Sequence, residues 1–108
     1  MIDDEPTVCE AMRMILKVDR HLIETFTDPR EGAKYAIEND WDIVLLDLQM
    51  PHMHGLAIAE LLKRRYPKKP IVTVAARTLI PAQANVDRVL LKPFGVQELR
   101  QAITDLIP

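Results

Sequence analysis

Residues 41–51 read WDIVLLDLQMP and carry the clearest structural signal in the chain. The aliphatic run from Ile43 to Leu46 is followed at once by Asp47, and Met50-Pro51 then breaks the chain. A continuous run of β-branched and aliphatic residues is typical of a strand covered on both faces. The sequence therefore predicts a buried strand of a parallel sheet, with a carboxylate at its carboxyl end.

Further apolar runs alternate with amphipathic segments on both sides of this strand. Strands are predicted at Ile2, over Leu22–Phe26, over Ile71–Ala75 and over Val89–Leu91. Helices are predicted from Pro6, from Pro29 behind the cap residue Asp28, after Gly55, and over Gly95–Leu106. Right-handed crossovers turn this order into an α/β fold: a doubly wound, five-stranded parallel sheet with helices on both faces.

The composition limits the chain to one domain, residues 1–108, of which 48% are hydrophobic. The formal net charge is −2, and the basic clusters Lys63–Arg65 and Lys68–Lys69 are interpreted as a solvated helix end, so direct nucleic-acid binding is not expected. The one cysteine, Cys9, excludes an internal disulfide. We see neither a membrane span nor a signal peptide and expect a cytoplasmic protein.

Charged residues follow three of the predicted strands: Asp3-Asp4, Asp47 and Lys92. The carboxyl ends of parallel strands meet at one edge of a sheet, so these side chains should converge there. Converging carboxylates repel one another, and a hard divalent cation such as Mg²⁺ relieves that repulsion while leaving positions for a phosphate. Lys92 adds a mobile positive charge that can pair first with Asp47 and later with a phosphoryl oxygen.

Three motifs together resemble the receiver domain of two-component response regulators. They are Asp3-Asp4-Glu5-Pro6, then Asp47-Leu48-Gln49-Met50-Pro51 with Gly55 beyond it, and Lys92-Pro93-Phe94. The resemblance runs over essentially the whole chain. It implies a flavodoxin-like fold, as in chemotaxis response proteins, with strand order 2-1-3-4-5.

The resemblance also implies roles for individual residues. Asp47 would be the phosphoacceptor, taking its phosphoryl group from a histidine kinase or histidine phosphotransfer protein. Lys92 would hold that group, and a cis peptide bond before Pro93 would aim the lysine. The implied Mg²⁺ ligands are Asp4 directly, Asp3 largely through water, Asp47, and the backbone carbonyl of Gln49.

The sequence departs from the family pattern at the positions that relay phosphorylation. Ala75 stands where the family has Thr or Ser, and Val89 stands in place of the switching aromatic. Thr73 shares the face of Ala75 but is expected to lie too deep to substitute. The connection over residues 76–88 is short and contains Pro81, so the fourth helix should be shortened or irregular. In the family this face serves output and dimer formation, so a homodimer is one expectation.

Three functions remain open at this point. The first is a working receiver that catalyses at most its own phosphorylation and dephosphorylation, with a downstream target or output domain outside this chain. The second is a pseudo-receiver, a phosphorylation-independent interaction module, which Ala75 and Val89 favour. The third is an aspartyl-phosphate phosphatase, which Gln49 disfavours because such enzymes usually carry a second acid at that position.

Overall fold

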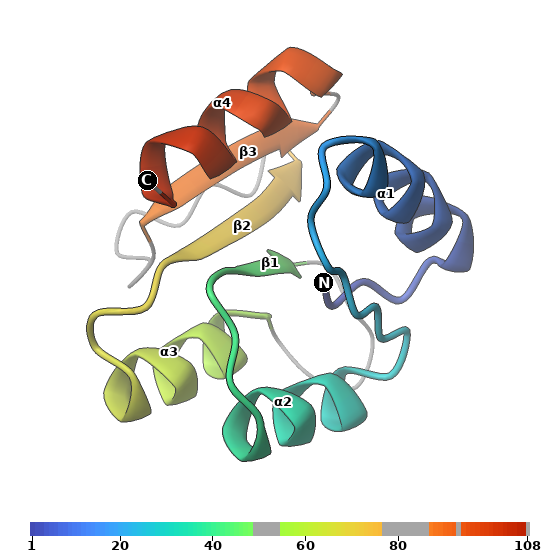
Figure 1. Cartoon of the computed structure of the whole chain (residues 1–108). Helices are drawn as coiled ribbons and strands as arrows, with labels where there is room; N and C mark the ends of the chain where they lie inside the picture. Colours follow the sequence, from blue (N-terminus) through green and yellow to red (C-terminus); the bar gives the residue numbers. More distant parts are fainter. Residues whose placement is uncertain (49–54, 77–86, 93, 108) are drawn as a thin grey trace.

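A computed structural model describes residues 1–48, 55–76, 87–92 and 94–107 of the chain. Along the chain these form α1 (Pro6–Val18), α2 (Pro29–Glu38), β1 (Val44–Asp47), α3 (Gly55–Arg65), β2 (Ile71–Ala76), β3 (Arg88–Lys92) and α4 (Val96–Leu106), as Figure 1 shows. The predicted fourth helix between β2 and β3 falls on residues 77–86, outside the described residues. The predicted helix starts at Pro6 and Pro29 are confirmed. The helix predicted after Gly55 begins at Gly55 itself, and the last helix begins one residue after Gly95.

The sheet is parallel, and in the described residues its strands lie in the order β1-β2-β3. Val44 pairs with Ile71 at the start of β1, and Ala76 pairs with Lys92 at the end of β2. Beyond β1, Ile2 forms single parallel bridges to Phe26 and to Leu46.

The prediction of five strands therefore holds only in part. Within the described residues there are three strands, and the first and second predicted strands are reduced to the bridge residues Ile2 and Phe26. Their side-by-side order (Phe26, Ile2, β1, β2, β3) is nevertheless the predicted one. Leu22, predicted as a strand residue, is instead fully exposed, so it packs against no sheet layer.

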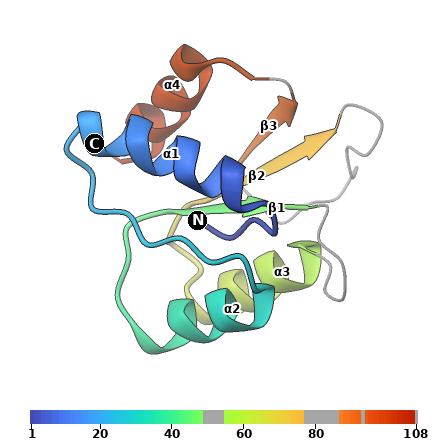
Figure 2. The same cartoon turned by 90° about the vertical axis from the view of Figure 1, so that its right-hand side faces the viewer.

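Helices cover both faces of the sheet, with α2 and α3 on one side and α1 and α4 on the other (Figures 1 and 2). The side chains of β1 alternate between these layers, as its pleat requires. Val44 and Leu46 join the cluster under α2 and α3, while Leu45 joins the cluster under α1 and α4. All four β1 residues are buried, which confirms the strand covered on both faces.

Local capping explains where the helices begin. Proline occupies the first turn of α1 and α2, where a missing N–H removes no helical hydrogen bond. The carboxylate of Asp28 accepts the Arg30 N–H at 2.9 Å, as predicted for the cap of α2. At α4, the Gly95 N–H donates to the carboxylate of Glu98 at 3.3 Å.

The basic cluster in the last turn of α3 is not uniformly solvated, so the interpretation as a solvated helix end is wrong for Lys63. Its side chain is 9% exposed, and its Nζ lies 2.6 Å from Asp87 Oδ2 and donates to the Lys69 carbonyl at 2.8 Å. Asp87 in turn accepts the Ile71 N–H at 2.7 Å. The sequence interpretation missed this because Asp87 is distant from Lys63 in the chain.

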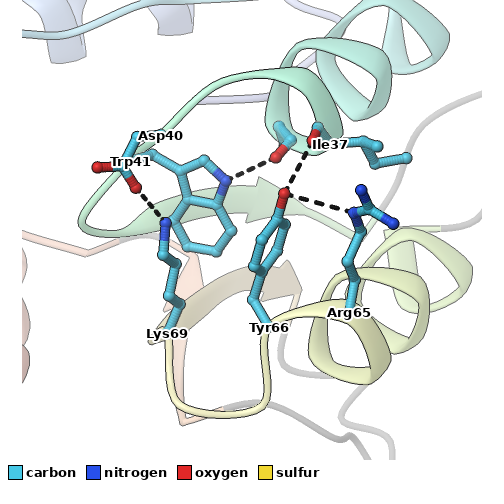
Figure 3. A network of polar contacts seen from close by, with 7 residues as sticks. Ile37, Asp40, Trp41, Arg65, Tyr66 and Lys69 are labelled. Carbon is cyan, nitrogen blue, oxygen red and sulfur yellow. Dashed lines mark hydrogen bonds and ion pairs between the residues drawn. The ribbon is translucent and has the colours of Figure 1, made fainter.

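A polar and aromatic network joins the end of α3 to the chain entering β1 (Figure 3). The Tyr66 hydroxyl donates to the Ile37 carbonyl at 2.8 Å, and the Tyr66 and Trp41 rings meet edge to face. The Lys69 ammonium lies 4.9 Å from both ring centroids and pairs with Asp40. Trp41 is therefore a packing residue, and it lies at the opposite edge of the sheet from Asp47.

Among the described residues, none of the helices has the length and apolar character needed to cross a membrane.

Candidate functional site

Three carboxylates converge at the carboxyl ends of neighbouring sheet positions. Asp47 is the last residue of β1. The Ile2 bridge to Leu46 sets the adjoining chain in register, and the next residue, Asp3, therefore lies beside Asp47. Oxygen atoms of Asp3, Asp4 and Asp47 all lie within 4.8 Å of one another, so the structure brings the predicted acidic residues together.

Two of these carboxylates are withdrawn from solvent. Asp3 is 0% exposed and Asp47 is 1% exposed, whereas Asp4 is half-buried. Asp3 Oδ1 accepts the Glu5 N–H at 2.9 Å, which closes the turn leading into α1. Asp3 Oδ2 is buried and has no hydrogen-bond partner among the described residues. A buried carboxylate oxygen in this condition is costly unless a cation or ordered water satisfies it.

The environment raises the pKa of Asp3 from its ordinary value of 3.8 to about 6. Burial is the largest cause, because it disfavours the charged form, and the neighbouring Asp47 and Asp4 act in the same direction. The Glu5 N–H and the Lys92 ammonium lower the pKa and offset part of this effect. The charged form of Asp3 is therefore disfavoured relative to that of an exposed aspartate.

Among the described residues, Lys92 brings a positive charge to the site. It is the last residue of β3, and its Nζ lies 3.6 Å from Asp47 Oδ1, with the lysine side chain 31% exposed. This position lets the ammonium reach both the carboxylate and the solvent-facing side of the site. The predicted meeting of Lys92 and Asp47 is thus present in the structure.

Gly55 packs against the end of β1 that carries Asp47, a role that the sequence did not predict. A Cβ atom at this position would lie 2.4 Å from the Asp47 carbonyl oxygen and 2.8 Å from Leu48 Cα. Such distances do not occur for real Cβ atoms, so only glycine allows α3 to start this close to the end of β1. The hydrogen bond from the Glu5 N–H to the Asp3 carboxylate was likewise not predicted, because the sequence does not show which backbone groups donate to a side chain.

The donor set fits a hard divalent cation. Carboxylate oxygens are the ligand type that Mg²⁺ prefers, and one of those in this cluster is buried with no hydrogen-bond partner among the described residues. Asp3, Asp4 and Asp47 could hold it. The predicted fourth ligand, the carbonyl of Gln49, and the predicted cis bond before Pro93 both lie outside the described residues.

The two unusual positions lie close to the site in the sheet. Ala75 is fully buried, pairs with Leu91 and carries no hydroxyl. Val89 is half-buried and pairs with Thr73. Thr73 also pairs with Leu46, one residue before Asp47, and its buried hydroxyl has no hydrogen-bond partner among the described residues.

Comparison with known proteins places this arrangement in a family. The family model for the response regulator receiver domain matches residues 1–104. The chain belongs to the response regulator receiver family. This receiver domain is 32% identical over 103 residues to the transcriptional regulatory protein KdpE of Mycobacterium tuberculosis, covering 91% of this chain and 45% of KdpE. It thus spans about half the length of that relative.

Solved structures agree with the fold of the receiver domain. The response regulator TrrA of Thermotoga maritima in complex with Mg²⁺-BeF is 25% identical, with a TM-score of 0.89 over 98% of this chain and 95% of TrrA. TrrA in complex with the histidine kinase ThkA is 24% identical, with a TM-score of 0.88 over 99% of this chain and 95% of the matched chain. The resemblance expected from the three motifs is confirmed.

Proposed function

We propose that this receiver domain accepts a phosphoryl group on Asp47 from a histidine kinase or histidine phosphotransfer protein. The observation that carries the proposal is the buried Asp47 carboxylate, grouped within 4.8 Å of Asp3 and Asp4 oxygens and 3.6 Å from the Lys92 ammonium. The sheet thereby holds the proposed nucleophile Asp47, the neighbouring carboxylates and the Lys92 ammonium together at one edge. Phosphoryl transfer depends mainly on such positioning and charge neutralisation.

The proposed step uses Asp47 as the nucleophile. One carboxylate oxygen attacks phosphorus while the P–N bond of the phosphohistidine breaks, and the departing imidazole takes up a proton from solvent. Lys92 then turns from the carboxylate to the transferred phosphoryl oxygens, which its partial exposure permits. The product carries about −1.5 to −2 charges, which is the local change available for signalling.

A Mg²⁺ ion held by Asp3, Asp4, Asp47 and the carbonyl of Gln49 would neutralise part of the charge that develops on the phosphoryl oxygens. The acidic cluster and the orphaned Asp3 oxygen support this assignment, as does the Mg²⁺-BeF complex of TrrA.

The proposed setting is a cytoplasmic two-component pathway. The curated relative KdpE is a transcriptional regulatory protein of which this chain matches 45%, so the output would lie outside the matched region. The TrrA–ThkA complex gives a precedent for a histidine kinase as the partner of a similar fold. A homodimer through the face around residues 76–88 remains part of the proposal. The domain would catalyse no more than its own phosphorylation and dephosphorylation.

Intact mass after incubation with Mg²⁺ and a small acyl phosphate tests the proposal. The expected result is one added phosphoryl group on the parent protein and on Asp42→Asn, whose exposed carboxylate lies outside the site. Asp47→Asn should gain none, and removal of Mg²⁺ should abolish the addition. Equal modification of Asp47→Asn would exclude Asp47 as the acceptor.

A second candidate is a pseudo-receiver that binds its partner regardless of phosphorylation. The observation that favours it is the missing hydroxyl at Ala75 together with the small side chain of Val89. Partner binding that is unchanged by the phosphodonor and by Asp47→Asn would support this candidate. Binding that depends on both would reject it.

A further inference from the structure

The thiol of Cys9 connects α1 to the acidic site. Cys9 is buried and forms the inner face of α1 together with Met12 and Leu16, at the spacing that a helix face requires. Packing alone would account for a small apolar residue at this position. It would not account for the direction of the thiol, because Cys9 Sγ donates to the Asp3 carbonyl oxygen at 3.3 Å.

The carbonyl that accepts this hydrogen bond belongs to the peptide group joining Asp3 to Asp4. A peptide group is planar, so a hydrogen bond to its oxygen restricts the plane that connects the two residues. Both residues carry carboxylates of the acidic cluster. Cys9 is the only side chain among the described residues that donates to this carbonyl. One thiol on a neighbouring helix thus restrains the backbone of two proposed Mg²⁺ ligands.

The other polar groups of Asp3 show why this restraint matters. The Asp3 N–H donates to the Phe26 carbonyl at 3.0 Å, and Asp3 Oδ1 accepts the Glu5 N–H at 2.9 Å. Asp3 Oδ2 is buried and has no hydrogen-bond partner among the described residues. Three of the four polar groups of Asp3 are therefore held by the protein, and the fourth is the one that a bound cation can satisfy.

We propose that Cys9 is a positioning residue for the Mg²⁺ site, because its thiol holds the Asp3–Asp4 peptide in place before the ion binds. Ligands that are already ordered lose less freedom on binding, so the contact raises affinity for the ion. Cys9 acts through Asp3 and is not itself a ligand. This role rests on the proposed function through its Mg²⁺ site, and not on Asp47 as the acceptor.

Calorimetric titration of Mg²⁺ into the whole chain at constant ionic strength tests this role. Cys9→Ala removes the donor and should raise the dissociation constant about three- to fivefold, as expected for one weak hydrogen bond. Cys9→Ser keeps a donor of similar size and should stay within about twofold of the parent. Cys9→Val fills the position without a donor and should behave like Cys9→Ala. Circular dichroism shows which variants are folded, and either apolar variant suffices for the comparison.

A matched core substitution separates the hydrogen bond from a general loss of packing. Ile103→Val removes one carbon from the core between α1, α4 and the sheet, and Ile103 has no contact in the acidic cluster. It should leave the Mg²⁺ dissociation constant unchanged. Hydrogen exchange in EDTA gives a second measurement: the Glu5 amide, which donates to Asp3 Oδ1, should exchange faster in the apolar Cys9 variants and unchanged in Cys9→Ser and Ile103→Val.

The outcomes distinguish this role from the proposed function itself. Equal Mg²⁺ affinity in the parent and the apolar variants, or an equal loss in Cys9→Ser, would overturn the role of Cys9 alone. A parent that binds no Mg²⁺, or binds it unchanged after Asp4→Asn, would overturn the metal assignment and this role with it. The expected order of affinities without phosphoryl uptake would contradict the proposed function and support the role of Cys9.

Discussion

At the scale of single residues, the Asp3 carboxylate is a proposed Mg²⁺ ligand whose burial destabilises the protein when no metal is bound. We expect Asp3→Asn to stabilise the protein in EDTA by about 1–2 kcal/mol above roughly pH 7, because it removes a charge whose burial raises the pKa to about 6. The amide oxygen can still accept the Glu5 N–H. Urea unfolding of parent and variant measures the difference.

The sign of the pH dependence makes this prediction specific. A raised folded-state pKa means that the protonated form of Asp3 favours folding, and this contribution is lost as pH rises from about 4 through about 6. The gain of Asp3→Asn over the parent should therefore disappear toward about pH 4. Asp42→Asn, at an exposed position, should show no such trend. With Mg²⁺ present the order should reverse, since only the parent keeps all three carboxylates.

Arg20 has a left-handed backbone conformation, which residues with a side chain rarely adopt. It follows α1 with φ of 66°, and its N–H donates to the Lys17 carbonyl while the His21 N–H donates to the Leu16 carbonyl. This Schellman arrangement normally places glycine in the left-handed position. Arg20→Gly should raise the free energy of unfolding by about 1 kcal/mol. The test is chemical denaturation, and a loss of stability would contradict this account.

Gly55 illustrates how the absence of a side chain allows α3 to start against the Asp47 backbone. Gly55→Ala would place a Cβ against the Asp47 carbonyl, so α3 or the end of β1 must move. We expect a loss of about 2 kcal/mol in stability and slower phosphorylation of Asp47. Gly95→Ala is the matched control, since its nearest neighbour lies 3.9 Å away and no clash arises. Similar effects of the two substitutions would exclude the close contact as the cause.

At the scale of elements, the Lys63–Asp87 pair ties α3 to the starts of β2 and β3. Removing Lys63 leaves the Asp87 carboxylate and the Lys69 carbonyl without their charged donor. We expect Lys63→Ala to cost about 2–3 kcal/mol of unfolding free energy, less than for a fully buried pair because Asp87 is 32% exposed. Thermal and urea unfolding both measure this loss.

The neighbouring Arg64 provides the control for this pair. It bonds Glu60 on the exposed face of α3, with side chains 76% and 64% exposed. Exposed helix pairs contribute only about 0.3–0.5 kcal/mol, so Arg64→Ala should be nearly neutral. If both substitutions cost the same, the buried contact of Lys63 would not be what joins these elements.

The strands and helices also show which parts of the fold and of the site could be predicted from the sequence. The strands β1, β2 and β3 were predictable because each contains a short, mainly aliphatic run, which is typical of strands in a parallel sheet. The convergence of Asp3, Asp4, Asp47 and Lys92 followed from parallel strand direction. The role of Lys63 was not predictable, because its partner Asp87 is set by tertiary packing rather than by local pattern.

Two kinds of structural detail could not be predicted from the sequence, for physical reasons. Strands were predicted at Ile2 and at Phe26, but the described residues there form only isolated bridges, Ile2 to Phe26 and Ile2 to Leu46, since apolar character alone does not determine how many residues pair. The close approach of Gly55 to the Asp47 carbonyl depends on three-dimensional distance, which no spacing rule gives. The predicted roles of Gln49 and Pro93 stay predictions, because both residues lie outside the described part of the chain.

At the scale of the whole molecule, the acidic site and Trp41 occupy opposite edges of one sheet. Domains of this size usually unfold in one cooperative step, so an ion bound at one edge should stabilise the other. At a Mg²⁺ concentration about 100 times its dissociation constant, stability should rise by about 2.7 kcal/mol. We expect the urea transition followed by Trp41 fluorescence to shift to higher urea by the same amount as the transition followed by circular dichroism.

The control is Asp4→Asn at matched ionic strength, because this half-buried ligand can be changed with little loss of packing. That variant should unfold at the same urea concentration with and without Mg²⁺. A shift in circular dichroism without a shift in Trp41 fluorescence would mean that the two edges unfold separately. An equal Mg²⁺ shift in Asp4→Asn would place the ion elsewhere. Equal Mg²⁺ shifts by circular dichroism and Trp41 fluorescence, both absent in Asp4→Asn, would establish that ion binding at the acidic site stabilises the whole sheet.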